Sequence, residues 1–269
     1  MITLMIHTAL GALIITSLCA QSAAAQDPPA PFKELEGKLR KARTVQAVIT
    51  GVRTVEIHQA GVKTATNVIE LRTEFFSEMD GKSRIVHQFG AVNDASPDKL
   101  EVVNDGAALR AFYKGQQAPS PPEWTRQEIP SGWRDAILRY LAVGRASAIV
   151  VPSFSSVNKP RDGPNEFNGA ALRFKMSVDK AGPPAAERAG ERDAQVIAYD
   201  WTDAMAAREI KVTAKVWIDT KTGLPFKRSH RYSLDVENLR LEVSEEESLE
   251  SFRLDEPIDA GVFVVPKGK

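Results

Sequence analysis

The sequence predicts a mainly β (α+β) fold in which two helices cover one face of an antiparallel sheet. Apolar and polar residues alternate along most segments between residues 45 and 254, which is the two-residue period of a strand with one buried face. Asp80-Gly81 and Asn104-Asp105-Gly106 supply the glycines that tight hairpin turns require. Only two segments show strong helical spacing, so most of the chain is left for the sheet.

Both helices are predicted from apolar residues spaced three or four positions apart. The first ends near Arg43, and its apolar face consists of Phe32, Leu35, Leu39 and Ala42. The second follows a proline-rich segment, residues 115–132, that we interpret as a surface loop. The apolar face of this second helix consists of Trp133, Ile137, Tyr140 and Leu141.

Roughly nine to eleven strands are predicted. One strand places four residues on the buried face: Ile69, Leu71, Thr73 and Phe75. A later strand does the same with Val212, Ala214, Val216 and Ile218. Residues 181–193, rich in Pro, Ala, Gly and charged residues, are predicted to form a loop. We interpret the run Glu245-Glu246-Glu247 as a solvated edge or loop, because like charges repel one another.

The chain begins with the features of a secretory signal peptide. An apolar stretch from Ala9 to Ala20 precedes small residues that suit cleavage between Ala25 and Gln26. We expect residues 1–25 to be a signal peptide and residues 26–269 to form a single domain outside the cytoplasm. An uncleaved membrane anchor is the alternative, because the apolar run is nearly long enough to span a bilayer.

Composition excludes several classes of function. The only cysteine, Cys19, lies in the predicted signal peptide, so the exported chain would have neither disulfides nor cysteine-based metal sites. The 35 Lys and Arg residues balance the 35 Asp and Glu residues, and no local basic run occurs. Nucleic acid is therefore not an expected partner.

No arrangement of residues indicates catalysis. Beyond the signal region the histidines are His58, His87 and His230, which are isolated and lack the HExxH spacing of a zinc site. The sequence contains neither a Gly-x-Ser-x-Gly elbow nor a phosphate-binding glycine loop. We therefore predict no enzyme activity, no cofactor and no metal.

Four stretches carry a family resemblance. They are the helix-to-strand opening from Phe32 to Ile57, the phrase MDGKSRIVHQF, the hairpin VVNDGAALRAFY, and the ending VWIDTKTGLPFKRSHR through DEPIDAGVFVVPKGK. In this order the chain resembles the periplasmic outer-membrane lipoprotein carrier family, the LolA-like proteins with their relatives LolB and RseB. The resemblance implies an incomplete antiparallel β-barrel, strongly curved, whose helices act as a lid over an apolar cavity for acyl chains.

The resemblance also implies a ligand-binding face. Arg84 matches an arginine that helps hold the lid of the carriers closed, and the alternative is an outward arginine that is solvated or paired with a glutamate. The expected apolar lining is Ile69, Leu71, Phe75, Val212, Val216 and Phe226 on the sheet, with Trp133, Ile137 and Leu141 on the helix. The alternative for each of these nine is ordinary core packing, which usually fills the apolar face of a curved sheet.

Two functions follow from this comparison. The first is a non-catalytic periplasmic carrier of lipid or lipoprotein acyl chains, since each buried methylene contributes about 0.8 kcal/mol. It would act as a monomer, with a membrane donor or receptor protein as a further partner. The alternative is an envelope stress sensor or scaffold that binds a partner protein through the same half-barrel, although the chain lacks room for the second sizeable domain of a full sensor.

Overall fold

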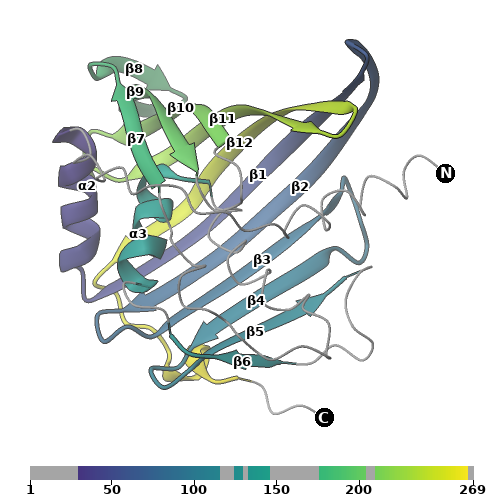
Figure 1. The fold of residues 1–269 in the computed structure, drawn as a ribbon. Helices are drawn as coiled ribbons and strands as arrows, with labels where there is room; N and C mark the ends of the chain where they lie inside the picture. The colour runs from purple at the N-terminus through teal and green to yellow at the C-terminus, as the bar shows by residue number, and fades with distance from the viewer. Residues whose placement is uncertain (1–29, 116–123, 130–132, 146–175, 204–209, 266–269) are drawn as a thin grey trace, which may run out of the picture.

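A computed structural model describes residues 30–115, 124–129, 133–145, 176–203 and 210–265 (Figure 1). In this part of the chain, twelve strands form one sheet and two helices lie against one of its faces. Neither of these helices is long and apolar enough to cross a membrane. The predicted signal peptide and most of the predicted loop at 115–132 lie outside the described residues.

The elements fall into two halves of the chain. The first half contains α2 (Ala30–Lys41), β1 (Thr44–Gln59), β2 (Val62–Glu78), β3 (Ser83–Ala91), β4 (Asp98–Asn104), β5 (Leu109–Lys114), β6 (Thr125–Gln127) and α3 (Trp133–Val143). The second half contains β7 (Met176–Ala181), β8 (Ala185–Ala189), β9 (Arg192–Asp203), β10 (Ile210–Asp219), β11 (Pro225–Val236), β12 (Leu239–Leu254) and the short 3₁₀ helix η1 (Ala260–Phe263).

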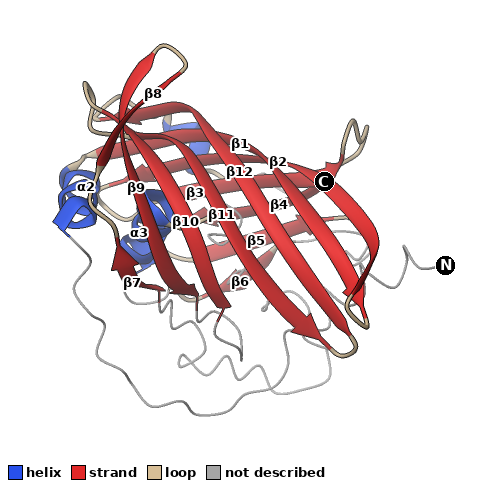
Figure 2. Cartoon of the chain, turned by 90° about the horizontal axis from the view of Figure 1, so that it is seen from above, coloured by secondary structure: helices blue, strands red, loops and turns tan. Residues whose placement is uncertain are grey.

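The strands follow the order β6-β5-β4-β3-β2-β1-β12-β11-β10-β9-β7, with β8 paired to β9. Each half of the chain forms an antiparallel meander, and the pairing of β1 with β12 joins the two halves. The edge strands β6 and β7 do not pair with each other, so the sheet is curved but open (Figure 2). The prediction of an incomplete β-barrel with helices on one face is confirmed.

Two strands lie where the sequence predicts loops. β8 is inside the predicted loop at residues 181–193, and β6 is inside the proline-rich segment. Most residues of β8 are exposed and it pairs only with β9, so no apolar alternation marks it as a strand. These two strands raise the number above the predicted nine to eleven.

The main core lies between the concave face of the sheet and the two helices. The predicted apolar faces of both helices are buried in it: Phe32, Leu35, Leu39 and Ala42 on α2, and Trp133, Ile137, Tyr140 and Leu141 on α3. The Phe32 ring contacts Tyr199 of β9 edge-on, with 4.8 Å between ring centroids. Full burial of such a side chain contributes about 1.5–3 kcal/mol, so the helices are held mainly by apolar packing.

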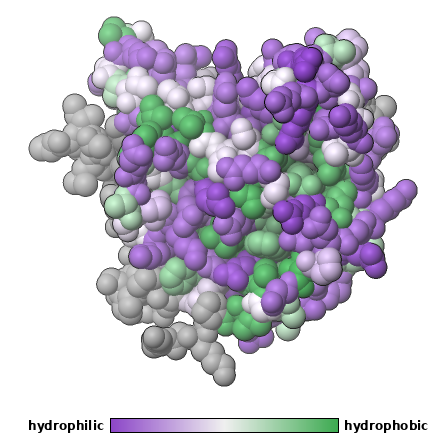
Figure 3. Space-filling model, turned by 180° about the vertical axis from the view of Figure 1, so that it is seen from behind, coloured by the Kyte–Doolittle hydropathy of each residue, from purple (hydrophilic) through white to green (hydrophobic). Residues whose placement is uncertain are grey.

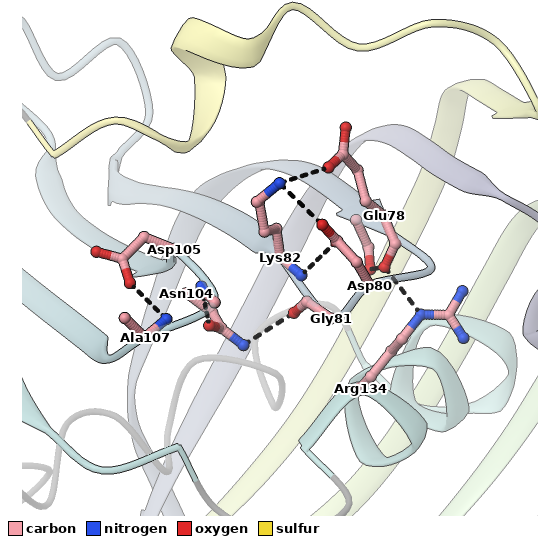
Figure 4. A network of polar contacts seen from close by, with 10 residues as sticks. Glu78, Asp80, Gly81, Lys82, Asn104, Asp105, Ala107 and Arg134 are labelled. Atoms are coloured by element: carbon pink, nitrogen blue, oxygen red, sulfur yellow. Dashed lines mark hydrogen bonds and ion pairs between the residues drawn. The ribbon is translucent and has the colours of Figure 1, made fainter.

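Polar contacts fix the start of α3 to the turns at one end of the sheet (Figure 4). The Trp133 indole donates a hydrogen bond to Ser83 Oγ at 3.1 Å, and Arg134 Nε donates to the Glu78 carbonyl oxygen at 3.2 Å. The neighbouring hairpins are also joined, because the Asn104 amide donates to the Gly81 carbonyl oxygen at 2.8 Å. Both predicted Asp-Gly turns form, and Gly81 and Gly106 have positive φ.

Two glycines offer a matched test of this backbone geometry. A Cβ at either Gly37 in α2 or Gly81 in the β2–β3 turn would meet nothing within 4 Å, but only Gly81 has a positive φ, of 98°. We expect Gly81→Ala to lower the free energy of unfolding by about 1–2 kcal/mol. Gly37→Ala should raise it by about 0.5–1 kcal/mol, because alanine favours the helix. Urea unfolding of both variants checks this, and equal shifts would contradict the turn geometry.

Candidate functional site

A band of polar side chains crosses the middle of the concave face. We call it the polar belt, and its members are Arg53 on β1, Thr73 on β2, His87 on β3, Arg228 and His230 on β11, and Glu245 and Glu247 on β12. Strand alternation points Arg53, Thr73 and His87 to the same face as the core residues Ile49 and Phe75. The sequence analysis did not recognise this belt.

Strand register brings the belt residues together from distant parts of the chain. Arg53 lies opposite Glu245, which in turn lies opposite His230. One step toward the helices, Glu247 lies between Gly51 and Arg228. Residues directly opposite in an antiparallel pair point to the same face, so these two rows place charged groups side by side.

The charges of the belt are buried and paired. Arg53 Nε is 2.8 Å from Glu245 Oε2, and Arg228 Nη2 is 2.6 Å from Glu247 Oε2. Arg228 Nη1 also donates to the Leu141 carbonyl oxygen at 2.8 Å, at the end of α3. Such pairs are tolerated inside a protein only when the remaining hydrogen-bonding groups are also satisfied or lie near opposite charge.

The interpretation of Glu245-Glu246-Glu247 as a solvated edge or loop is wrong. The segment is the middle of β12, and only Glu246 is exposed, whereas Glu245 and Glu247 are buried on the concave face. Both share the parity of Val243 and Leu249, two buried apolar residues of the same strand. That parity is present in the sequence and would have placed both carboxylates inside.

Burial sets the protonation states of the belt. Burial, and next the nearby Arg53 guanidinium, lowers the pKa of His87 to about 3. Burial and then Arg228 lower the pKa of His230 well below its ordinary value. Burial opposes ionisation of Glu245, yet Arg53, Arg145 and a hydrogen bond with Glu247 together hold the pKa of Glu245 well below its usual range. At neutral pH, therefore, both histidines are neutral and Glu245 is ionised.

Apolar residues lie on both sides of the belt. On one side is the main core under α2 and α3. On the other is a second apolar cluster, at the ends of β1, β2, β11 and β12 that extend away from the helices (Figure 1). Its buried members are Val55, Ile57, Val236, Leu241 and Val243. The concave face is thus apolar, then polar, then apolar along the strands.

Aromatic and cationic groups border the belt on the β9–β11 side. Arg145, just after α3, donates a hydrogen bond from Nη1 to the Tyr232 hydroxyl at 2.6 Å and stacks 4.4 Å from the centre of that ring. Trp201 of β9 is fully buried and meets the His230 ring edge-on, with 6.2 Å between centroids. Both contacts bring groups that donate hydrogen bonds close to the ion pairs.

Six of the predicted lining residues share the main core. They are Phe75, Trp133, Ile137, Leu141, Val212 and Val216, and each is at least 98% buried. Ile69 instead packs against the second apolar cluster, and Leu71 is buried between the two regions. The structure therefore divides the expected lining between the two sides of the polar belt.

Arg84 does not lie on the concave face. It alternates with Ser83 and Ile85, which face the core, so its side chain points to the outer face. There it forms an ion pair with Glu101 at 2.5 Å and donates a hydrogen bond to the Val262 carbonyl oxygen at 2.9 Å. The position of Arg84 therefore matches the alternative prediction, an outward arginine paired with a glutamate. The prediction that Arg84 lies at the cavity is wrong.

Phe226 also lies away from the main core. A register shift between Trp217 and Ile218 where β10 pairs with β11 leaves Phe226 as an extra residue. The side chain packs against a third cluster that contains Ala194, Val196 and Trp217. A bulge of this kind changes the face to which a side chain points, so simple alternation misplaces Phe226.

The outer face offers two weaker candidates. Seen from behind (Figure 3), hydrophilic and hydrophobic residues are interspersed on the surface. An open hollow of about 770 Å³ is lined there by small hydroxyl residues such as Thr50, Thr54 and Ser248. Nearby strand ends bring Glu56, His58 and Glu242 together, but Lys63 pairs with Glu56 at 2.6 Å. We interpret this second group as a surface charge network.

Comparison with known proteins gives structural neighbours only. No family model and no curated protein matches the sequence. A DUF1329 family protein from Desulfovibrio piger aligns over 89% of this chain and 98% of its own, with 9% identity and a TM-score of 0.31. A LolA superfamily protein from Nitrosomonas europaea aligns over 91% and 99%, with 9% identity and a TM-score of 0.27.

A third neighbour is a Vibrio parahaemolyticus domain assigned to outer-membrane lipoprotein sorting. It aligns over 86% of this chain and 94% of its own, with 11% identity and a TM-score of 0.31. At these TM-scores the alignments carry no argument about the site, so its interpretation rests on the side chains described above.

Removing the Arg228 guanidinium tests the belt. Arg228→Ala leaves Glu247 without its ion-pair partner and removes the donor to the end of α3, so we expect a loss of about 3–5 kcal/mol in the free energy of unfolding. Arg231→Ala on the same strand is the matched control, because Arg231 is exposed, and should change stability by less than about 0.5 kcal/mol. Urea unfolding measures both, and similar values for the two variants would contradict a buried, paired Arg228.

The buried histidines predict acid sensitivity. Their pKa values are lower in the folded protein than in the unfolded chain, so the unfolded chain binds extra protons below about pH 6.5. Each histidine then lowers the free energy of unfolding by about 1.4 kcal/mol per pH unit down to its folded pKa. Urea titrations between pH 6.5 and 4.5 should show this slope, and His87→Gln should reduce it by about one proton. An unchanged slope in that variant would contradict a neutral His87.

Proposed function

We propose that the protein is a non-catalytic periplasmic carrier that binds the acyl chains of a lipid or lipoprotein inside its half-barrel. The observation that carries this proposal is the open sheet, whose apolar concave face is covered by two separate helices. A closed barrel of about eight strands has an interior just wide enough for its own side chains or one small ligand, whereas this sheet has twelve strands and is open. Here the cover can move without breaking any strand pairing, which is what binding and release of a long apolar ligand require.

The contacts of α3 support movement of the cover. Besides its apolar packing, α3 makes ion pairs with α2, such as Arg139 with Glu36 at 3.3 Å, and polar contacts with the sheet at its two ends. These include Trp133 with Ser83, Leu141 with Arg228, and the Val143 carbonyl oxygen, which accepts a hydrogen bond from Tyr199 at 2.5 Å. Each such bond contributes about 0.5–1.5 kcal/mol. A dozen methylenes offer roughly 10 kcal/mol on burial, which exceeds the contribution of these bonds, and the acyl chain would replace the apolar contacts that α3 leaves.

The second apolar cluster gives the acyl chain a place outside the helices. Ile69 packs against the cluster that contains Val55 and Leu241, and Leu71 lies on the same face of β2, two residues nearer the helices. The strand ends that carry this cluster extend away from α2 and α3 (Figure 1). We therefore place the first contact of an entering acyl chain at this cluster, with the residues under α3 reached when the helix moves.

A scaffold that binds a partner protein is the second candidate. Val52 on β1 and Val68 on β2 are 45% and 40% exposed on the outer face of the sheet. Such a surface suits a protein partner. Capture of a stoichiometric membrane protein by lipid-free protein would favour this function.

Paired cysteine labels on β2 test acyl-chain binding. Val68 lies 40% exposed on the outer face, and its neighbour Ile69 faces the second apolar cluster. In a Cys19→Ser background, Ile69→Cys and Val68→Cys are each labelled with a fluorophore sensitive to polarity. We expect dodecanoate to change the emission of the label at position 69 and to leave the label at position 68 unchanged.

Native mass spectrometry of the exported protein completes the test. The proposal expects bound species with the masses of lipids or acyl chains. If only the bare polypeptide mass is observed and neither label responds to dodecanoate, the carrier function is wrong. A response from both labels would indicate general unfolding of the labelled proteins. Urea midpoints that match the wild type exclude such unfolding.

A further inference from the structure

Three side chains at the edge of the polar belt carry buried nitrogens that have no hydrogen-bond partner among the described residues. They are the indole Nε1 of Trp201, both ring nitrogens of His230, and Nε of Arg228. The side chains of Trp201 and His230 are completely buried. Each unsatisfied buried polar group destabilises the folded protein, and more strongly when it is charged. Natural proteins retain few such groups, so three in one place require an explanation.

These groups are neighbours across three strands. Trp201 lies on β9 and His230 on β11, and the strand between them, β10, presents the small side chain of Ala214 opposite His230. The His230 and Trp201 rings meet edge-on, 6.2 Å apart. Arg228 is two residues from His230 on the same face of β11. The unpaired nitrogens therefore converge on one part of the concave face.

Guanidinium groups border these nitrogens. Arg53 pairs with Glu245, Arg228 pairs with Glu247, and Arg145 stacks on the Tyr232 ring. The Arg145 guanidinium lies 5.9 Å from the Trp201 ring centre, on the border of the same region. His230 is neutral at pH 7 and offers one N–H. An indole and a guanidinium can only donate hydrogen bonds, so the ligand that satisfies them must supply acceptors.

We propose that Trp201, His230 and Arg228 form a binding site for an anionic group, a carboxylate or phosphate, at the polar belt. This inference rests on the proposed carrier function and specifies its ligand: an amphiphile with an acidic head group. The head group binds the unpaired donors, and its acyl chain lies on one of the apolar regions that flank the belt. Hydrogen bonds to an ionised acceptor are about twice as strong as neutral ones, so an acid is preferred over an alcohol of equal length.

Isothermal titration calorimetry of the full chain at pH 8 tests the head-group preference. Dodecanoate and dodecan-1-ol carry the same acyl length but differ in charge, and inorganic phosphate carries the charge alone. We expect dodecanoate to bind the wild type at least about tenfold more tightly than dodecan-1-ol. Trp201→Phe, which removes the indole N–H, should reduce this ratio to about threefold or less by weakening dodecanoate alone.

Trp217→Phe is the matched control. Trp217 is also a buried tryptophan of the sheet, but its indole donates to Glu187 Oε1 at 2.9 Å on the outer face. This variant should keep the tenfold ratio. His230→Phe is a second test of the site that does not depend on the folding of the Trp201 variant, and it should lose the preference as well. Urea midpoints confirm that each variant is folded.

The outcomes separate this inference from the carrier function. If neither amphiphile binds the wild type, the carrier function itself fails, and the site for an amphiphile fails with it. If both bind equally, the carrier function stands and the anionic site is overturned. If Trp201→Phe and His230→Phe both keep the preference, the site is overturned as well. Binding of phosphate alone, lost in both variants, would support an anion site and identify a free anion as its ligand.

Discussion

The position of α3 on the sheet depends on one buried guanidinium. Arg228 reaches from β11 to the carbonyl oxygens of Tyr140 and Leu141 in the last turn of α3, and it pairs with Glu247 on β12. A cation is favourable at the negative end of a helix, whereas a buried charge without partners costs several kcal/mol. Because one side chain makes both contacts, the pairing of the central strands and the placement of the helix are linked. Any movement of α3 away from the sheet must find a new partner for Arg228.

The polar belt also restricts the register of β12. Gly51 lies opposite Glu247, and a Cβ at Gly51 would come within 2.7 Å of the Glu246 carbonyl oxygen, so glycine allows the close approach of β1 and β12. A slip of one residue would turn Glu245 and Glu247 to the outer face and bring Glu246 inward. Glu246 would then be the one carboxylate of the three that faces Arg53 and Arg228, leaving one of these two cations unpaired. Ion pairs inside a sheet add little stability, but they make a wrong register costly.

Sequence patterns predict the helices and most strand faces because buried apolar residues mark those faces directly. They miss the polar belt because a run of glutamates is typical of a solvent-exposed surface. The parity of Val243 and Leu249 nevertheless shows that two of the three glutamates in the run 245–247 point inward. The prediction that Arg84 lies at the cavity is wrong because it follows the family resemblance instead of the alternation of Arg84 with the buried Ile85. The position of Phe226 depends on a bulge between two strands, and such a feature arises from three-dimensional pairing that no local pattern reports.

Register and helix placement explain only part of the belt. Arg53, Glu245, Glu247 and Arg228 contact one another, and their mutual attraction offsets part of the cost of burial. The nitrogens of His230 contribute nothing to register, because no acceptor in the described part of the chain lies within hydrogen-bonding distance of them. A phenylalanine in that position would fill similar space without the unpaired nitrogens. The polar nitrogens of His230 therefore lower the stability of the ligand-free protein. An interaction with a further molecule is the simplest physical reason for a histidine at this position.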